Sequence, residues 1–435
     1  MKDTTDIIKG FSRLTKDEKI DLITTLYATD AASANALLNS YMHADAAVQK
    51  THDGFAENTL SNYYLPYGIA PNVMVNGRLY AVPMVIEESS VVAAASKAAS
   101  FWTCRGGFKA RVDGMEKKGQ VHLYYRGEKA VFERFFEQNR DRLIEAVRPI
   151  TDKMTARGGG ITSLVLKDLT HIESDYYQVD LSAITMDSMG ANFINSVLEA
   201  VADEMKRLFK EQAVTGELEV IMCILSNYTP GCVAHVEVSA PVEDMAYGTM
   251  EGEVFASRFV RAVRMAEICV ERAVTHNKGI MNGIDAVVLA TGNDFRAIEA
   301  CAHAYAARDG QYSSLSHAEI KDGVFRFWID VPLALGTVGG LTRLHPLAGL
   351  SMDIMGRPSA SELMMITAAV GLAQNFGAVA SLVTSGIQRG HMKMHLNNIL
   401  LSLGANDDQI AAAKEFFKDR TVSHSAVAEF LEKNK

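Results

Sequence analysis

A lysine surrounded by small and amide residues is the most chemically distinctive feature of the sequence. Lys278 lies in THNKGIMNGIDAVVLATGND, residues 275–294, near Asn277 and Asn282, and this segment ends at Asp294. An ammonium group in such surroundings can stabilise a developing oxyanion, and an acid such as Asp294 keeps it charged and oriented. The polar composition also predicts that the segment contributes little to a core. The alternative is a solvated lysine in a surface loop, the commoner role of a lysine.

Two adjacent acids stand in apolar sequence: Glu87 and Glu88 in VPMVIEESSVVAAAS, residues 82–96. Burial raises the pKa of a carboxyl group toward neutrality, the state a general acid needs, and we expect one of the two to be partly buried. The alternative is a pair of exposed acids at a helix start, where they complement the helix dipole.

A histidine near the C-terminal end is a third candidate. His391 in SGIQRGHMKMH has glycine on one side and a helical pattern on the other, which predicts a loop-to-helix junction that can move. A histidine can donate a proton near pH 7. The alternative is a residue that caps or packs a helix.

Nucleotide-binding motifs of the common kinds are missing, since the sequence contains neither GxGxxG after a strand nor GxxxxGK[ST]. The remaining candidate is DSMGAN, residues 187–192, which follows a strand pattern and opens a helix. Free N–H groups at that helix start, together with Gly190, could receive a pyrophosphate. The alternative is an ordinary helix start with an aspartate cap.

The elements that carry these residues fall into a regular pattern in the middle of the chain. Residues 111–221 show an alternating run near 120, a long amphipathic stretch over 130–156, two strand-like runs, an amphipathic helix over 190–212 and a buried strand. This β-α-β-β-α-β order predicts a ferredoxin-like domain.

The segments on both sides of it predict a larger unit. Residues 1–110 and 222–385 are rich in alanine and in helical patterns, for example over 251–275 and 293–307. We therefore expect an α+β protein with a large helix-rich domain, an inserted ferredoxin-like domain, and a small helical unit over 386–435. Thr15 and Glu18 predict a capping box at the first helix.

Composition narrows the class of protein. The chain has 435 residues, 48% of them hydrophobic, and a net charge of −9, which disfavours nucleic acid and anionic membrane surfaces as partners. Its five cysteines are never in a CxxC pair, so no zinc site is expected and a reducing compartment is indicated. No signal-peptide or membrane-spanning run is apparent, and we expect a soluble, cytoplasmic protein.

Ten segments, in this order, carry a resemblance to a known family: ENTLSNYYLPYGIAPN, VPMVIEESSVVAAAS, GGFKA, ARGGG, DSMGAN, ILSN, THNKGIMNGIDAVVLATGND, HAYAARDGQY, VGLAQNFGA and GIQRGHM. Together they span nearly the whole chain, which resembles the bacterial class II 3-hydroxy-3-methylglutaryl-CoA (HMG-CoA) reductases. The resemblance implies a metal-free, four-electron reduction of HMG-CoA to mevalonate and CoA by two NAD(P)H, or its reverse. It also implies a substrate domain, an inserted nicotinamide domain, a C-terminal flap and a cytoplasmic homodimer or an oligomer of dimers.

The resemblance also assigns roles to individual residues. It implies a catalytic set of Glu88, Lys278, Asp294 and His391, with Asp294 connecting the glutamate and the lysine. Contacts to HMG-CoA are implied for Ser90, Asn227, Arg272, Asn282, Gln374 and, at the CoA phosphates, Arg13. The lysine and the glutamate of one site are expected on different subunits of the dimer. Ser89 replaces the proline of the family's EEPS, and Ser188 replaces the alanine of its DAMGAN.

The cofactor is assigned to two segments of the inserted domain. The first is the DSMGAN loop with Asp187, Ser188, Met189, Gly190 and Asn192. The second is the region of Thr151 and Asp152, where relatives that prefer NADH place an acid on the ribose. Neighbouring Arg148, Lys153 and Arg157 could accept a 2′-phosphate instead, so NADPH is slightly favoured over NADH.

Two other classes of function are compatible with parts of the sequence. A CoA-ester lyase or isomerase could use the same Glu, Lys and Asp without a nicotinamide. A ferredoxin-like insert could also bind RNA, but the net charge and the missing aromatic strand motif argue against that function.

Overall fold

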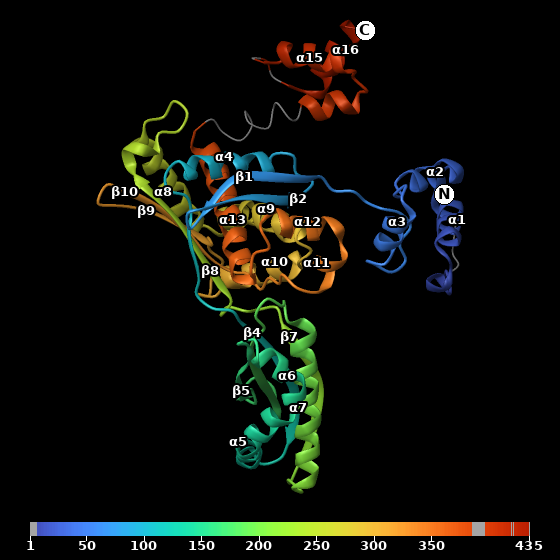
Figure 1. Ribbon diagram of the computed structural model, residues 1–435, viewed down its shortest axis with the longest axis vertical. Helices are drawn as coiled ribbons and strands as arrows, with labels where there is room; N and C mark the ends of the chain where they lie inside the picture. Colours follow the sequence, from blue (N-terminus) through green and yellow to red (C-terminus); the bar gives the residue numbers. More distant parts are fainter. Residues whose placement is uncertain (1–6, 385–395, 419, 421, 435) are drawn as a thin grey trace.

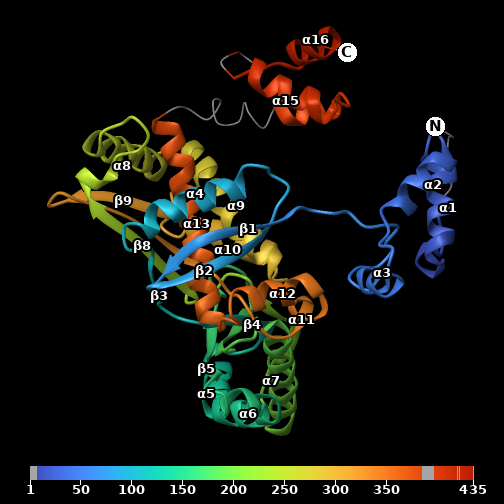
Figure 2. The ribbon, with the colours of Figure 1, turned by 45° about the horizontal axis from the view of Figure 1, so that its top comes forward.

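The computed structural model describes residues 7–384, 396–418, 420 and 422–434. A short helical turn, η1 (Phe11–Arg13), and three helices form an N-terminal arm: α1 (Lys16–Tyr27), α2 (Ala31–Ser40) and α3 (Ala46–Asp53). The predicted capping box of α1 is confirmed, because Thr15 accepts from the Glu18 N–H and the Thr15 N–H donates to the Glu18 carboxylate. Figure 2 shows the arm standing to the side of the central helices and strands.

The large unit is built around two sheets. A hairpin pairs β1 (Tyr67–Val75) with β2 (Arg78–Val85), and a four-stranded antiparallel sheet has the order β3-β8-β10-β9. The strands of that sheet are β3 (Lys109–Val112), β8 (Val233–Pro241), β9 (Ser316–Lys321) and β10 (Val324–Pro332), and a 3₁₀ turn, η2 (Val242–Met245), follows β8. One apolar core joins the two sheets to the helices between and after them.

Those helices run along the chain as α4 (Val91–Thr103), α8 (Gly252–Ile268), α9 (Val270–Ala290), α10 (Phe295–Ala306), α11 (Gly340–Leu344), α12 (Pro346–Ile354) and α13 (Ala360–Val383). Helix α13 lies in the middle of this unit, with α4 and α9 beside it (Figure 1). The helical pattern predicted over 251–275 is divided into α8 and α9 at Cys269, which has an extended backbone.

Helix α13 is apolar on all sides because it is a core helix. Among the described residues, this 24-residue helix alone is long and apolar enough to cross a membrane, with a mean hydropathy of 1.5 over its most apolar window. However, 83% of its most apolar window is buried inside the chain. A helix that is hydrophobic all round is expected at such a position in a large domain.

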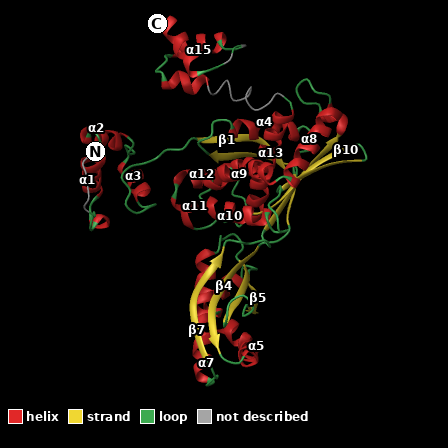
Figure 3. Ribbon diagram, turned by 180° about the vertical axis from the view of Figure 1, so that it is seen from behind, coloured by secondary structure: helices red, strands yellow, loops and turns green. Residues whose placement is uncertain are grey.

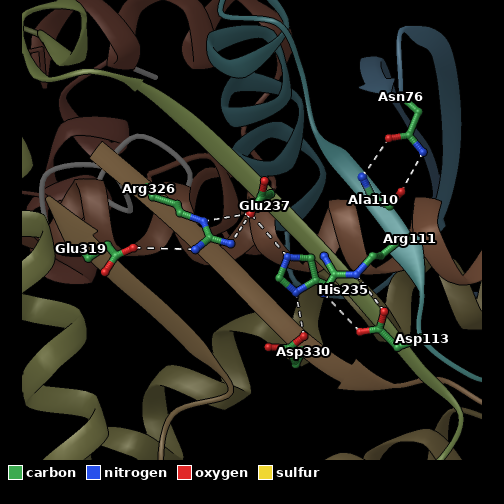
Figure 4. A network of polar contacts seen from close by, with 9 residues as sticks. All are labelled: Asn76, Ala110, Arg111, Asp113, His235, Glu237, Glu319, Arg326 and Asp330. Carbon is green, nitrogen blue, oxygen red and sulfur yellow. Dashed lines mark hydrogen bonds and ion pairs between the residues drawn. The ribbon is translucent and has the colours of Figure 1, made fainter. Parts of the chain in front are cut away.

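Cross-strand pairs of polar side chains line the face of the four-stranded sheet opposite the core (Figure 4). His235 on β8 is paired in register with Asp330 on β10, and the His235 Nδ1 to Asp330 Oδ1 distance is 2.7 Å. Beside them, Arg326 donates from Nε to Glu237 Oε2 at 2.8 Å. His235 and Asp330 are directly opposed, whereas Arg326 and Glu237 are diagonal neighbours on the same face, and both contacts support the register of β8 and β10.

The inserted unit has the predicted ferredoxin-like fold. Its elements are β4 (Glu116–Arg126), α5 (Lys129–Ala146), α6 (Arg148–Thr155), β5 (Gly160–Asp168), β6 (Tyr176–Ile184), α7 (Ala191–Glu211) and β7 (Glu217–Ser226). The antiparallel sheet has the order β5-β6-β4-β7, and the helices cover one face of it (Figure 3). The predicted helix over 190–212 is confirmed as α7.

Three details of the inserted unit differ from the sequence prediction. The strand expected to be buried, β7, is an edge strand with no fully buried residue, and Ile221 and Met222 are 52% and 50% exposed. The single helix expected over 130–156 is interrupted at Val147, because Pro149 occupies the first turn of α6 and cannot continue α5. The boundaries expected at 110/111 and 221/222 fall inside β3 and β7, since β7 pairs with β4 as far as Ser226.

The C-terminal residues form a helical unit with its own core. Residues 396–402 are helical and are followed by α15 (Asp407–Phe416) and α16 (His424–Lys433). Eight buried side chains from these three helices pack together, Leu400, Ala413 and Val427 among them. The candidate residue His391 lies outside the described residues.

Candidate active site

Helix α9 and the loop before α4 bring three polar side chains together. Lys278 Nζ donates to Glu88 Oε2 at 2.8 Å, and Asn282 Nδ2 donates to the same oxygen at 3.2 Å. Lys278 and Asn282 are four residues apart on α9, so they lie on one face of the helix. Glu88 lies in the short loop between β2 and α4, in the stretch where the sequence predicted a partly buried acid.

The cluster is open to solvent on one side. The side chain of Lys278 is 62% exposed and that of Glu88 is 36% exposed. Glu87, the other acid of the pair, is exposed and has no ion-pair partner among the described residues. A ligand arriving from solvent can therefore reach both the ammonium and the carboxylate.

The segment around Lys278 is part of the core, contrary to the sequence prediction. His276 and Asn277 are 1% and 0% exposed. They tolerate burial because Asn277 donates to Ser313 O and accepts from Leu315 N–H, while His276 Nε2 lies 2.6 Å from Ser316 Oγ. Burial also lowers the pKa of His276 to about 3, and nearby Arg272 acts in the same direction. Hydrogen-bond partners that lie close in space thus allow these polar side chains of α9 to be buried.

The expectation that Lys278 and Glu88 of one site come from different subunits is wrong. The two side chains are in contact within a single chain. The close approach of α9 to the segment that follows β2 explains the contact, because α9 packs directly against that strand.

Asp294 is not part of this cluster within one chain. It caps α10, accepting from the N–H groups of Arg296 and Ala297 at 3.0 and 3.2 Å, and its carboxylate also pairs with the Arg296 side chain. Helix α9 continues for 12 residues from Lys278 to its end at Ala290, which is about 18 Å at 1.5 Å per residue. Lys278 therefore lies near the middle of α9, whereas Asp294 follows the C-terminal end of that helix.

The other five residues assigned to the substrate are spread over five parts of the chain. Ser90 is the N-cap residue of α4 and makes no side-chain capping bond. Arg272 lies on α9, and burial lowers the pKa of its guanidinium. Gln374 on α13 is buried, and its Oε1 has no hydrogen-bond partner within the described ranges. Asn227 follows β7, and exposed Arg13 lies in the N-terminal arm.

The DSMGAN loop links the inserted unit to the large unit. Gly190 is the N-cap residue of α7 with a left-handed φ of 89°, and no side chain caps the helix start. Asp187 Oδ1 accepts from the Ala360 N–H at the start of α13 at 2.7 Å, and Asp187 O accepts from the Thr337 N–H at 2.8 Å. Ser188 and Met189 are half-buried between these contacts, and Asn192 is exposed.

The second predicted cofactor segment is helix α6. Thr151 is buried, with 6% of its surface exposed, so its side chain does not face solvent. Asp152 is exposed and pairs with Arg148 at 3.4 Å. Lys153 and Arg157 are exposed and form no ion pair within the parts of the chain that the structure describes.

One buried residue near the DSMGAN loop was not predicted from the sequence. Lys117 on β4 is only 2% exposed, and its Nζ donates to Thr185 Oγ1 and Ser188 O, both at 2.7 Å. It borders a small cavity of about 30 Å³ between the two units, which Met189, Asn227 and Cys301 also line. The alternation of the strand could have indicated its burial, because Lys117 lies on the same side of β4 as Val121 and Leu123, which are buried.

Comparison with known proteins identifies the family. The family model for hydroxymethylglutaryl-coenzyme A reductase matches residues 17–396, and the chain belongs to this family. It is 35% identical over 430 residues to the 3-hydroxy-3-methylglutaryl-coenzyme A reductase of Archaeoglobus fulgidus, covering 98% of this chain and 94% of that protein. It is 34% identical to a probable reductase of Borreliella burgdorferi, covering 82% of this chain and 81% of the relative.

Solved structures agree with the sequence comparison. A reductase of Streptococcus pneumoniae matches with a TM-score of 0.73 and 33% identity, covering 98% of this chain and 99% of the other. A structure of the class II reductase of the same organism bound to NADPH matches with a TM-score of 0.72 and 34% identity, covering 86% of this chain and 99% of that one. The predicted family and fold are therefore confirmed.

Proposed function

We propose that this protein is a cytoplasmic enzyme that reduces HMG-CoA to mevalonate and free CoA with two molecules of a nicotinamide dinucleotide. The observation that carries the proposal is the contact of Lys278, Glu88 and Asn282 at a solvent-accessible position in a member of the reductase family. Two hydrides and two protons convert the thioester into a primary alcohol and a thiol. The bound dinucleotide supplies each hydride, and the protein supplies the charges and protons.

The geometry of the cluster supports a distinct role for each side chain. The Lys278 ammonium can donate a hydrogen bond to the thioester oxygen as negative charge develops there, which lowers the barrier to hydride addition. Glu88, 2.8 Å from Lys278 Nζ, is within reach to pass a proton to that oxygen. Asn282 holds the carboxylate in place by donating to the same Glu88 oxygen.

The remaining assignments concern the substrate and its departing thiol. Arg272, on the same helix as Lys278, is a suitable partner for the terminal carboxylate of the HMG group. Ser90, Asn227 and Gln374 are proposed to contact the HMG group or its surroundings, and Arg13 the CoA phosphates. His391 is proposed, on its sequence context alone, to protonate the departing CoA thiolate.

The inserted unit fits a dinucleotide in its chemistry. Helix α7 begins at Gly190 without a side-chain cap, so the N–H groups of its first turn are available to a pyrophosphate. Helix α6, which packs against α7, carries exposed Lys153, and exposed Arg157 follows shortly after the end of the helix. These cations favour NADPH over NADH, and the related Streptococcus pneumoniae reductase is bound to NADPH.

Two features support an assembly of at least two chains with a shared site. Asp294 lies far along α9 from Lys278, so a second copy could bring its own Asp294 to the Lys278–Glu88 pair. The N-terminal arm also exposes Tyr27, Leu37 and Tyr41, and the segment that joins the arm to β1 exposes Tyr63, which is 89% exposed. Exposed apolar groups on a projecting arm are typical of an interface between chains.

A coupled absorbance assay tests the proposed reaction. Adding HMG-CoA to the full chain with NADPH is expected to oxidise two molecules of cofactor per CoA released, and NADH is expected to support a slower rate. Release of CoA or loss of the thioester without oxidation of either nicotinamide would overturn the proposal and favour the lyase or isomerase class. The reverse direction is measured with mevalonate, CoA and the oxidised cofactor.

A further inference from the structure

Lys117 is a buried cation without an anionic partner. Only 2% of its surface is exposed, and no carboxylate lies within 4 Å of its Nζ in the described part of the chain. Burial lowers the pKa of its ammonium group, and Cys232 and Asp187 act in the opposite direction without cancelling that effect. Moving a charged group out of water costs several kcal/mol unless its hydrogen bonds are satisfied. The fold therefore bears an energetic cost at this position.

The acceptors of Lys117 both belong to one short loop. Lys117 donates to Thr185 Oγ1 and to Ser188 O, and Thr185 Oγ1 donates to the same carbonyl at 2.7 Å. The three groups form a closed triangle that fixes the loop between β6 and α7. Hydrogen bonds from a charged donor are roughly twice as strong as neutral ones, so Lys117 is the strongest of these restraints.

The loop itself is tightly folded. Gly190 has a left-handed backbone, and an added Cβ would lie 2.6 Å from the Thr185 side chain. Met186 also has a positive φ of 49°, which is unfavourable for a residue with a long side chain. A loop with this strain needs restraints from its surroundings to keep one conformation.

The large unit holds the opposite side of the loop. Asp187 accepts from the Ala360 and Thr337 N–H groups, and Gly336 lies so close that an added Cβ would be 2.5 Å from Met189 N. Lys117 therefore restrains the loop from the side of the inserted unit, and the large unit restrains it from the opposite side. The start of α7 is positioned by both restraints together.

We propose that Lys117 is a positioning residue for the cofactor, which acts through the Thr185–Gly190 loop and does not contact the reacting atoms. This inference rests on the proposed function, because it assumes that the uncapped start of α7 receives the dinucleotide. Without Lys117 the loop loses its charged restraint, and the N–H groups of α7 are presented to the cofactor in more than one orientation. Cofactor affinity falls, while the chemistry at Lys278 and Glu88 continues once the cofactor is bound.

The test compares Lys117→Met and Lys117→Gln with Lys118→Met. Lys118 is the next residue on β4, faces the opposite side of the sheet, and loses the same charge on substitution. Dissociation constants for NADPH and NADH are measured with the full chain by cofactor fluorescence, and kcat and KM by steady-state assays. We expect Lys117→Met to raise both dissociation constants roughly tenfold or more, with kcat at saturating cofactor and KM for HMG-CoA nearly unchanged.

The companion variants separate the possible explanations. Lys117→Gln keeps a donor and is expected to fall between wild type and Lys117→Met, whereas Lys118→Met is expected to bind cofactor normally. The melting temperature of Lys117→Met is expected to stay the same or rise, because the variant removes a buried unpaired charge. Normal cofactor binding by Lys117→Met, or an equal loss in Lys118→Met, would overturn the inference. Failure of wild type to bind either nicotinamide would instead reject the proposed function.

Discussion

At the scale of single residues, Lys278 at the centre of the proposed site differs from its neighbours on α9 in solvent exposure. His276 and Asn277 are buried on α9, yet Lys278, the next residue, is 62% exposed. The buried neighbours fix the helix position through hydrogen bonds to the segment before β9, so the lysine is held by its backbone while its ammonium stays accessible. This arrangement suits a charge that must meet an incoming thioester.

Loss of Lys278 is expected to remove catalysis without removing binding. Lys278→Ala deletes the only cation that contacts Glu88 among the described residues, and we expect turnover to fall by roughly 10²-fold or more, as for loss of an oxyanion partner. HMG-CoA affinity, measured by calorimetry, is expected to change little. Lys210→Ala on α7 is the control. Near-normal turnover of Lys278→Ala would exclude the lysine from the mechanism.

A half-buried acid pair gives the stability of the fold a dependence on pH. Asp285 on α9 faces Glu299 on α10, and burial together with the Glu299 carboxylate raises the pKa of Asp285 to about 8. An unfolded chain has an aspartate pKa near 3.9, so between pH 4 and 8 the unfolded state loses a proton that the folded state keeps. Stability contributed by this group is therefore full below about pH 4 and is lost as the pH rises toward 8.

Asp285→Asn tests that dependence, because an amide of the same shape cannot titrate. The difference in melting temperature, variant minus wild type, is expected to increase steadily from pH 5 to pH 8. Glu299→Gln removes the neighbouring charge and is expected to produce a smaller change in the same direction. A difference that does not vary with pH would show that Asp285 has an ordinary pKa.

At the scale of elements, sequence patterns located the helices and strands better than they located the partners of individual residues. The inserted β-α-β-β-α-β order followed from periodicity, since each strand and helix has one apolar face. Burial of His276 and Asn277 was not predictable, because their partners Ser313, Leu315 and Ser316 are about 40 residues away in sequence. Lys117 was missed for the same reason: only folding brings its acceptors, 68 and 71 residues away, against it.

The crossing of α9 and α13 depends on glycine. A Cβ added at Gly283 would lie 2.8 Å from both Gln374 Cβ and Val370 O, so Gly283→Ala forces the helices apart. We expect a loss of about 1–3 kcal/mol in the free energy of unfolding, measured with urea. Gly279→Ala, one turn earlier, meets only Ala378 at 4.0 Å and is expected to gain about 0.5–1 kcal/mol from helix propensity. Equal effects of the two changes would contradict this account of the crossing.

At the scale of the whole molecule, one chain provides an incomplete set of the proposed catalytic groups. Glu88 and Lys278 meet in one chain, whereas Asp294 caps α10 at the distant end of α9. We propose that a site that uses all three takes Asp294 from a second copy. In a two-fold dimer the exchange is reciprocal, so each chain would complete the site of the other.

Subunit mixing distinguishes this assembly from the one expected from the sequence. When inactive Asp294→Ala and Lys278→Ala proteins exchange subunits, one of the two sites in each mixed dimer combines wild-type Glu88 and Lys278 with a wild-type Asp294. Half of the dimers are mixed at random and half of their sites are intact, so recovery is expected to approach about a quarter of wild-type activity. Mixing Glu88→Ala with Lys278→Ala is expected to restore nothing, because every site then lacks one member of the pair. If mass measurements show exchange and only the second mixture regains activity, Glu88 and Lys278 act across the interface and the shared-site assignment of Asp294 is wrong.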